Sequence, residues 1–413
     1  MDVKSIFTKV LNEVKPKESV LNKVQPILDT IQTAATDNNV DAVVQCGGST
    51  AKDTYLATNH DCDVFVKFNY KEYKEHDISQ TLEGVLKKTP YEFTKVHGSR
   101  DYFQATILGI EYEVIPVLDV KSADEALNVT DMSPMHVKWV IDRTKDTMLT
   151  DQIRLTKQFA KAHRVYGAES YIGGFSGHII DILVIYYGGF TQLLNASQKW
   201  IEGDIIDPMN FYKNRDDALE HLNESKIDSP LIIIDPILSE RNAASALTKK
   251  RWYAFKKAAK LFLANPTFDQ FLCKPLDKND FEKGVYQLTI KPQLGKSDVV
   301  GGRCKKVFEY IKNQAIKNDF SIKRLDWEYD AEETNLFYVT KNTELKRHKI
   351  IRGPPLTMTS RCEEFAEGKE KTFEKGGFLF AEEEREFTTF SSFLKHIITT
   401  EYVTERVEKI SIV

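Results

Sequence analysis

The stretch Cys46-Gly47-Gly48-Ser49-Thr50-Ala51-Lys52-Asp53, followed by Asp61-Cys62-Asp63-Val64-Phe65-Val66, decides the fold prediction for this chain. Side chains two residues apart in a strand project from the same face, so Asp61 and Asp63 lie together while Cys62, Val64 and Val66 face the core. Two adjacent carboxylates repel each other unless a divalent cation neutralises them, and Mg²⁺ is the usual cation where phosphates also bind. The run therefore predicts a metal-binding pair, with an edge strand that exposes two aspartates as the plain alternative.

Two further features favour a catalytic interpretation of this pair. The Gly47-Gly48-Ser49 turn stands where the chain would enter a short helix, so its backbone N–H groups and the Ser49 hydroxyl could hold a triphosphate. The later segment Glu111-Tyr112-Glu113-Val114-Ile115-Pro116 is expected to be extended, and a neighbouring strand there would set Glu113 beside the two aspartates. The pattern then predicts a three-carboxylate site for two metal ions, as in phosphoryl transfer.

The composition predicts a multidomain globular protein. The chain has 413 residues, of which 41% are hydrophobic and 29% charged. Its five cysteines show no Cys-x-x-Cys spacing, which indicates neither a disulfide framework nor a zinc site. With no long apolar run and a polar start, we expect no membrane span, no export signal and a cytoplasmic location. The net charge of −4 disfavours a uniformly basic nucleic-acid binder, so contacts with a phosphate backbone must come from local patches.

Hydrophobic periodicity predicts an α+β multidomain fold. We expect an α/β domain over residues 1–145, a helical central domain over 146–275 and a second α/β domain over 276–390. Residues 391–413 are expected to form a C-terminal helix and tail, for which packing back on the central domain is one option. A long helix is predicted to run from near residue 242 to residue 263. The acidic run 381–386 is interpreted as solvated surface.

Further motifs follow the carboxylates in order along the chain. They are Ser133-Pro134-Met135-His136-Val137-Lys138-Trp139, Arg154-Leu155-Thr156-Lys157, Val165-Tyr166-Gly167-Ala168-Glu169, Gly174-Phe175-Ser176-Gly177, Asp235-Pro236, Arg241-Asn242-Ala243-Ala244-Ser245-Ala246-Leu247 and Arg352-Gly353-Pro354-Pro355. Together with the Gly-Ser turn and the Asp-x-Asp pair, they resemble the archaeal (class I) CCA-adding enzymes, tRNA nucleotidyltransferases of the DNA polymerase β-like superfamily. The resemblance covers nearly the whole chain, and Tyr-Gly-Ala-Glu with Gly-Phe-Ser-Gly is more specific than the carboxylate pattern.

The resemblance implies an activity and a set of site residues. Such an enzyme adds C, C and A to the 3′ end of tRNA from CTP and ATP, in one active site, without a nucleic-acid template and with release of pyrophosphate. Residues 1–145 would then be the nucleotidyltransferase catalytic domain, 276–390 the RNA-binding domain, and a homodimer is implied by the family alone. The implied residues are Asp61, Asp63 and Glu113 as ligands of Mg²⁺, Ser49 and Lys52 for the triphosphate, His136, Lys157 and Tyr166 around the phosphates and ribose, and Arg241 as a reader of the base edge.

Several of these residues also have an ordinary structural interpretation. Tyr166 would pack between helices, His136 would be a hydrogen-bonded loop residue and Lys157 would extend to solvent. Arg241 would be a surface charge at a helix start, beside Asn242 as the N-cap. Two positions also depart from the family pattern.

Those departures concern the metal site and the turn. Glu113 stands where the family usually has aspartate, and Asp53 where it usually has glycine, which adds a negative charge near the predicted triphosphate. Two rival functions therefore stay open on the sequence. A poly(A)-type nucleotidyltransferase of the superfamily would accept CTP poorly, and an RNA-binding pseudoenzyme would bind tRNA without incorporating a nucleotide.

Two basic helices are expected to contact the RNA backbone. The first carries Lys256, Lys257 and Lys260, with apolar and aromatic residues on another stripe, and the second carries Arg303 and Lys306. A solvated helix face is the alternative for each cluster.

Overall fold

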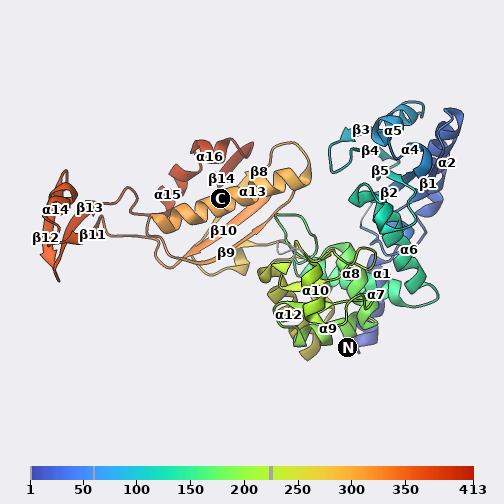
Figure 1. Ribbon diagram of the computed structural model, residues 1–413. Helices are drawn as coiled ribbons and strands as arrows, with labels where there is room; N and C mark the ends of the chain where they lie inside the picture. The colour runs from blue at the N-terminus through green and yellow to red at the C-terminus, as the bar shows by residue number, and fades with distance from the viewer. Residues whose placement is uncertain (1, 59–60, 223–226) are drawn as a thin grey trace. The chain divides into compact units, whose positions relative to one another are not determined.

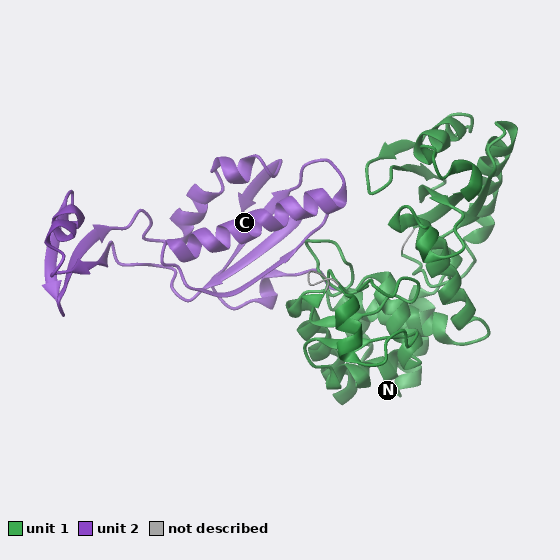
Figure 2. Cartoon of the chain, in the orientation of Figure 1, with its two compact units in different colours: residues 1–273 green, residues 274–413 purple. Residues whose placement is uncertain are grey.

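The computed structural model describes residues 2–58, 61–222 and 227–413. The chain forms two compact units, Met1–Cys273 and Lys274–Val413 (Figure 2). The division at Lys274 lies beside the boundary predicted after residue 275.

A five-stranded sheet organises the first part of unit 1, in the order β1-β2-β5-β4-β3 (Figure 1). The strands are β1 Ala42–Cys46, β2 Asp61–Phe68, β3 Thr94–Val96, β4 Tyr102–Ile107 and β5 Ile110–Leu118. β2 and β5 run parallel, whereas the other neighbouring strands are antiparallel. One face is covered by α2 (Leu21–Asp37) and α5 (Ile78–Leu86), whose apolar stripes pack on Cys62, Val64 and Val66. The predicted alternation in β2 is confirmed, because these residues are buried while Asp61 is exposed.

The opposite face of the sheet is covered in part by two other helices. These are α3 (Gly48–Ala51) and α6 (Ser133–Thr144), and Phe65, Val117 and Val137 form the small core between sheet and helix. Asp63 lies on β2 two residues before Phe65 and therefore on this same face. Short elements complete this part: α4 Tyr70–Tyr73, η1 Ala123–Glu125 and η2 Val129–Met132.

The second part of unit 1 is a helical bundle with a small parallel sheet. Its elements are α1 Val3–Val14, α7 Leu149–Ala162, α8 Gly177–Tyr187, α9 Phe190–Lys199, β6 Asp204–Ile206, α10 Arg215–His221, β7 Leu231–Ile233, α12 Lys249–Ala264 and η3 Phe268–Phe271. The first helix belongs here, because Ile6, Val10 and Val14 are buried in the bundle core. Trp139 and Val140 of α6 join the same core, so residues from both ends of the predicted range 1–145 pack on the helices.

The predicted long helix starts later than expected. α12 begins at Lys249, and its N-cap is Thr248, whose hydroxyl accepts a bond from the Arg251 N–H at 3.4 Å. The Asn242 side chain instead accepts bonds from the backbone N–H groups of Ile233 (3.0 Å) and Ala244 (2.8 Å). These bonds hold residues 242–248 in a loop, because a short amide side chain competes with helical hydrogen bonding.

No single helix in the described part of the chain is long and apolar enough to cross a membrane. Taken together, α8 and α9 reach that length and composition, with a bend of 92° between them.

Unit 2 is built on a four-stranded antiparallel sheet in the order β14-β8-β10-β9. Its elements are η4 Lys278–Asp280, β8 Val285–Lys291, α13 Ser297–Lys317, β9 Ile322–Glu328, β10 Thr334–Thr340, α15 Phe390–Ile397, α16 Glu401–Thr404 and β14 Lys409–Ile412. α13 lies across one face of the sheet (Figure 1), and the Tyr338 hydroxyl of β10 donates to the Phe308 carbonyl of α13 at 3.0 Å. The option of a tail packed on the central domain is wrong, because β14 pairs with β8.

A smaller sheet follows β10 in unit 2. Its order is β11-β13-β12, formed by β11 His348–Pro355, β12 Lys371–Lys375 and β13 Phe378–Glu384, with α14 Thr359–Ala366 against β11. Most of the acidic run at 381–386 is thus strand. Its glutamates pair across the sheet: Glu382 with Lys371 (3.0 Å), Glu383 with Lys349 and Lys369 (both 3.1 Å), and Glu384 with Arg347 (2.7 Å).

Candidate active site

The Gly47-Gly48 turn is built against the strand that carries the aspartates. The Gly47 N–H donates to the Asp63 carbonyl at 2.7 Å, which ties the turn to β2. Gly48 has φ +52°, and a Cβ added there would lie 1.6 Å from Asp63 Oδ2. Only glycine fits this conformation and this approach without strain. The turn and the Asp-x-Asp run are therefore two halves of one structure.

The parallel pairing of β2 with β5 brings the third predicted carboxylate to the same place. Asp63 is paired in register with Glu113, and Glu113 accepts a bond from the Gln104 side chain at 2.7 Å. Burial, together with the charges of Glu113 and Asp61, raises the pKa of Asp63 to about 6 although Lys52 opposes this. A cation would remove that cost, and an all-oxygen donor set suits a hard divalent ion.

A cavity of about 210 Å³ lies beside these carboxylates. It is lined by Gly48, Ser49, Lys52, Tyr55, Leu56, Asp61, Asp63, Lys157, Lys161, Tyr166, Gly177 and His178. The structure thus brings together Ser49, Lys52, Asp61, Asp63, Lys157 and Tyr166 from the predicted set. Lys161 and His178 were not predicted. Lys161 follows Lys157 by one helical turn on α7, and that spacing is the signal that could have found it.

The two predicted lysines share one buried carboxylate. Lys52 Nζ lies 2.5 Å from Asp181 Oδ2, and Lys157 Nζ lies 3.7 Å from Asp181 Oδ1. Lys157 also donates to the carbonyl and hydroxyl oxygens of Thr54, at 3.1 and 3.0 Å, and it is only 3% exposed. The ordinary interpretation, in which Lys157 extends to solvent, is therefore wrong. Burial lowers the pKa of Lys157 to about 8, although Asp181 opposes the shift.

The Tyr166 motif folds back on the start of α8. The Phe175 N–H donates to the Val165 carbonyl at 2.7 Å, and the Gly167 N–H donates to the Phe175 carbonyl at 2.8 Å. A Cβ on Gly174 would lie 2.2 Å from the Val165 carbonyl oxygen, so the two segments can approach only with glycine there. Ser176 caps α8 by accepting from the Ile179 N–H at 3.2 Å. This fold places Tyr166 and His178 on one wall of the cavity.

Asp53 forms an ion pair with a buried arginine. Its carboxylate pairs with Arg154, whose guanidinium is buried and also bonds Asp151 Oδ1 at 2.8 Å and the Tyr55 carbonyl at 3.2 Å. The negative charge of Asp53, which was expected to lie near the triphosphate, is thus paired with the positive charge of Arg154.

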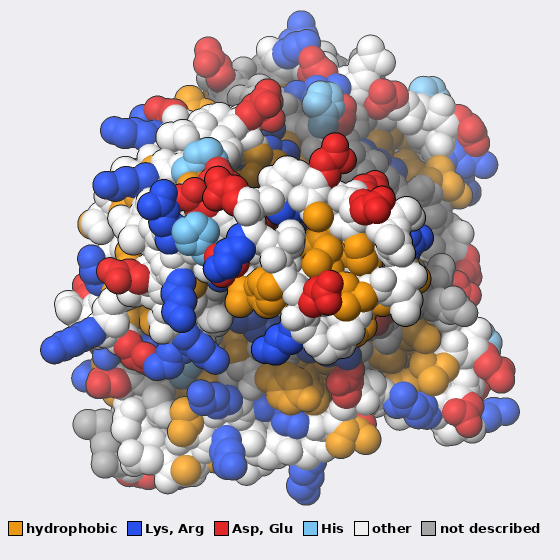
Figure 3. Space-filling view, turned by 90° about the vertical axis from the view of Figure 1, so that its left-hand side faces the viewer, with side chains coloured by type: hydrophobic (Ala, Val, Ile, Leu, Met, Phe, Trp, Pro, Cys, Tyr) orange, Lys and Arg blue, Asp and Glu red, His pale blue; other side chains and the backbone are white. Residues whose placement is uncertain are grey.

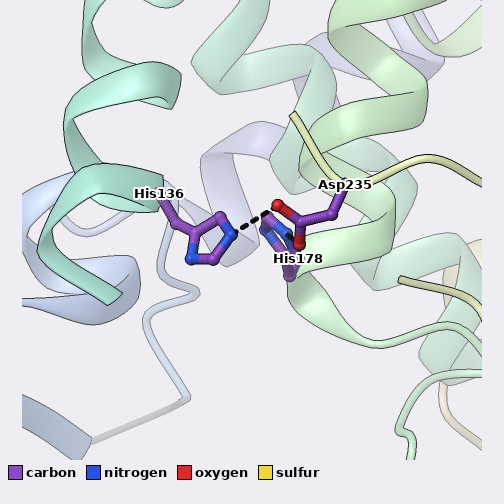
Figure 4. A group of neighbouring side chains, drawn as sticks. All are labelled: His136, His178 and Asp235. Carbon is purple, nitrogen blue, oxygen red and sulfur yellow. Dashed lines mark hydrogen bonds and ion pairs between the residues drawn. The ribbon is translucent and has the colours of Figure 1, made fainter. Parts of the chain in front are cut away.

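His136, His178 and Arg241 meet at the Asp235 carboxylate. Figure 4 shows the two histidines around Asp235. His136 Nε2 lies 2.7 Å from Asp235 Oδ1, and His178 Nε2 and Arg241 Nη1 each lie 3.2 Å from Oδ2. His178 lines the 210 Å³ cavity, whereas Arg241 lines a neighbouring one of about 500 Å³. The Asp235-Pro236 motif predicted no role for Asp235, and no local pattern links this residue to partners so distant in sequence.

This cluster also has the ligand types of a metal site. His136, His178 and Asp235 each offer one ligand atom within 4.8 Å of the others. The Asp235 carboxylate, however, already accepts bonds from Arg241 and from the backbone N–H groups of Ile237 (2.9 Å) and Leu238 (3.2 Å). A cation would have to displace a guanidinium, so the carboxylates of β2 and β5 are the better metal ligands.

The predicted RNA-contacting residues differ in their surroundings. Lys257 and Lys260 of α12 are exposed, as are Arg303 and Lys306 of α13, and Arg303 donates to the Gln293 side chain at 2.6 Å. Lys256 donates to the Trp200 carbonyl and lies 4.5 Å from the centre of the Trp252 ring, so it has a local structural contact. On the face drawn in Figure 3, Lys and Arg side chains are interspersed with Asp and Glu.

Solved structures with a similar fold include nucleotidyltransferases. A cytoplasmic RNA terminal U-transferase matches with a TM-score of 0.53 at 14% identity, over 66% of this chain and 99% of that chain. A structure of Cid1, described for its RNA terminal uridylyl transferase activity, matches with the same TM-score and identity over 67% of this chain and 99% of that chain. At this identity the likeness concerns the fold alone.

Sequence comparisons identify the family. The model of the second domain of tRNA nucleotidyltransferase matches residues 151–272, and that of the C-terminal domain of the CCA-adding enzyme matches residues 289–409. The CCA-adding enzyme of Nanoarchaeum equitans is 34% identical over 82% of this chain and 83% of its own length. That of Methanocaldococcus jannaschii is 28% identical over 96% and 91%. The chain therefore belongs to the family of CCA-adding enzymes, the tRNA nucleotidyltransferases.

Proposed function

We propose that this protein adds C, C and A to the 3′ end of tRNA, using CTP and ATP and releasing pyrophosphate. The observation that carries the proposal is the 210 Å³ cavity, in which carboxylates, lysines and a hydroxyl from four separate motifs converge. Membership of the CCA-adding enzyme family supplies the acceptor RNA and the two nucleotides.

The cationic wall of the cavity is suited to a triphosphate. Lys52, Lys157 and Lys161 face one cavity, and the turn that contains Ser49 lies at its edge. Asp181 fixes the ammonium groups of Lys52 and Lys157, so little side-chain entropy is lost when phosphates bind. Because Lys157 is held by Thr54 as well, its role is to present a fixed charge to one phosphate oxygen.

Asp61, Asp63 and Glu113 are the residues that would hold divalent metal, which we take to be Mg²⁺. Bound there, two ions would activate the RNA 3′-hydroxyl and stabilise the leaving pyrophosphate. The carboxylates themselves set the position of the acceptor: β2 and β5 are rigid strands, and Gln104 fixes the Glu113 side chain. Glutamate in place of aspartate is thus supported by a neighbour on β4.

Arg241 is the proposed reader of the incoming base. A planar guanidinium has several donors in a fixed arrangement and fits acceptors on a base edge. Its carboxylate partner and its place at the 500 Å³ cavity support this role. A homodimer and a cytoplasmic location are further expectations that accompany the family.

One incorporation experiment tests the proposal. A tRNA that lacks its 3′ end is incubated with CTP, ATP and Mg²⁺, and the product is sequenced. We expect C, C and A in that order. Addition of A alone with poor use of CTP would favour a poly(A)-type enzyme, and tRNA binding without any addition would favour an RNA-binding pseudoenzyme. The Asp63→Ala variant is the control for contaminating activity.

A further inference from the structure

Asp235 joins three elements that form the nucleotide site. Its carboxylate is fully buried and contacts His136 of α6, His178 near the start of α8, and Arg241 in the loop after β7. His178 belongs to the 210 Å³ cavity and Arg241 to the neighbouring one of about 500 Å³. A single carboxylate therefore links the proposed triphosphate pocket to the proposed base-reading arginine.

The bonding around Asp235 determines how its donors are oriented. Oδ1 receives His136 Nε2 and the backbone N–H groups of Ile237 and Leu238, and Oδ2 receives His178 Nε2 and Arg241 Nη1. Burial opposes ionisation, but the bonds from the two histidines hold the pKa of Asp235 well below its usual range. Because an ionised carboxylate only accepts, both Nε2 atoms carry a hydrogen. The imidazole and guanidinium planes are thereby fixed.

The loop that carries Arg241 is closed on the same residue. The Asp235 N–H donates to the Arg241 carbonyl at 2.9 Å, and the Arg241 N–H donates to the Leu238 carbonyl at 2.9 Å. Arg241 is thus held to Asp235 through both its backbone and its side chain, although 35% of the side chain remains exposed. Arg241 lines the 500 Å³ cavity, so a ligand there meets its side chain in a defined orientation.

We infer that Asp235 is a positioning residue for nucleotide selection, which acts by holding Arg241 in the orientation that accepts cytosine and adenine. This rests on the proposed function. In the part of the chain that the structure describes, Asp235 forms its ion pairs with His136, His178 and Arg241. The proposed metal ligands and the cavity lysines are not among them. Its loss should therefore change which nucleotide is added more than the rate with the correct one at saturation.

The test is Asp235→Asn, with Asp131→Asn as the matched control. Asp131 is also buried, pairs with Arg100, and accepts bonds from the backbone N–H groups of Leu118 (2.9 Å) and Asn128 (2.9 Å). Its partners do not include His136, His178 or Arg241, and because Asn128 lines the 500 Å³ cavity, Asp131→Asn is a stringent control. Both variants replace a buried, saturated carboxylate with an amide. We expect both to melt at lower temperature, and only Asp235→Asn to lose selectivity for CTP and ATP over UTP and GTP, by about 10- to 100-fold, chiefly through KM.

Two further variants keep the inference open to refutation if Asp235→Asn folds poorly. Asp235→Glu keeps the charge and the acceptors but moves the carboxylate, so a smaller loss of selectivity is expected. In the double variant Asp235→Asn/Arg241→Ala, the selectivity should equal that of Arg241→Ala alone, because Asp235 acts through Arg241. A simple structural role would leave the selectivity ratio unchanged in Asp235→Asn and Asp235→Glu.

The outcomes separate the inference from the proposed function. Wild-type selectivity in Asp235→Asn, or an equal loss in Asp131→Asn, would overturn the positioning role. Failure of the wild-type protein to add C or A to a truncated tRNA would instead overturn the proposed function.

Discussion

Gly48 allows the start of α3 to approach Asp63 of β2 closely. In Gly48→Ala, the added methyl would lie 1.6 Å from Asp63 Oδ2, so the carboxylate must move. We expect incorporation of CTP to fall on the order of 100-fold, because a displacement of about 1 Å is enough for such a loss. The measurement is single-turnover incorporation on truncated tRNA.

Gly109→Ala is the matched control for that substitution. Gly109 also has a positive φ, +76°, but a Cβ there meets no heavy atom within 4 Å among the described residues. Both variants should lose about 1–2 kcal/mol of unfolding free energy to the left-handed backbone. Equal activities in the two variants would show that the approach of Gly48 to Asp63 has no catalytic importance.

Lys157 gives the proposed reaction a pH dependence. Its pKa of about 8 in the folded protein, set by burial, lies below the ordinary 10.5. Above pH 8 the free enzyme loses this charge, so KM for CTP should rise. Between pH 8 and 10.5 the unfolded chain binds more protons than the folded one, so this lysine should raise the unfolding free energy as pH increases.

The check is KM for CTP from about pH 7 to about pH 9.5. Lys157→Arg stays charged and should remove the rise, at some cost in affinity from its different shape. Lys87→Arg, a change at an exposed lysine paired with Glu83, should leave the rise in place. A constant KM in the wild-type protein would contradict the predicted role of Lys157.

At the scale of elements, the register between β2 and β5 decides which carboxylates meet at the proposed metal site. Because Glu113 is paired with Asp63, Glu113→Gln keeps the shape but removes a charge that would offset the cations. We expect incorporation to fall on the order of 100- to 1000-fold, with tRNA binding unchanged. Glu113→Asp should retain much more activity, since the family usually has aspartate there.

Asp119→Asn is the control for the Glu113 variants. Asp119 directly follows β5 at its other end and pairs with Lys67 at 2.7 Å, so it carries a comparable charge away from the site. Normal incorporation is expected. Activity in Glu113→Gln close to that of Asp119→Asn would refute the metal-ligand assignment.

Local sequence patterns predicted the helices and strands whose structure depends on residues within the same segment. The strand 285–291 is found with those bounds, because its apolar and polar residues alternate within the segment. The carboxylate pair was predictable for the same reason. The helix at 242–248 was wrong, because Asn242 bonds the backbone of Ile233, nine residues away. The solvated interpretation of 381–386 missed β13, because the strands that pair with it, β11 and β12, bring Lys349 and Lys371 to its glutamates.

Contacts between residues distant in the chain could not be predicted from the sequence. Arg154 pairs with Asp53, and Asp235 pairs with His136 and His178, in each case across more than fifty residues of chain. Such pairs carry no spacing signal, since the fold alone brings them together. Six residues of the predicted set line the cavity, namely Ser49, Lys52, Asp61, Asp63, Lys157 and Tyr166. Asp181, which pairs with two of the cavity lysines, was not predicted.

At the scale of the whole molecule, each compact unit carries its own basic helix. Lys257 and Lys260 lie on α12 of unit 1, and Arg303 and Lys306 on α13 of unit 2. The net charge of −4 conceals these clusters, because acidic residues elsewhere outnumber the basic ones. If both helices contact tRNA, basic residues of both units should contribute to the salt dependence of the affinity for tRNA.

The salt dependence of tRNA binding tests this directly. Each phosphate contact contributes about 0.7 to 0.9 to the slope of log K against log salt, through counterion release. Lys257→Ala/Lys260→Ala should therefore reduce the slope by up to about 1.8, and Arg303→Ala/Lys306→Ala by a similar amount, for any tRNA sequence. Lys87→Ala/Lys138→Ala changes the net charge equally but removes lysines already paired with Glu83 and Asp142, so its slope should stay near wild type. If a basic-helix variant gives the slope of this control, that helix is a solvated face and the tRNA backbone is bound elsewhere.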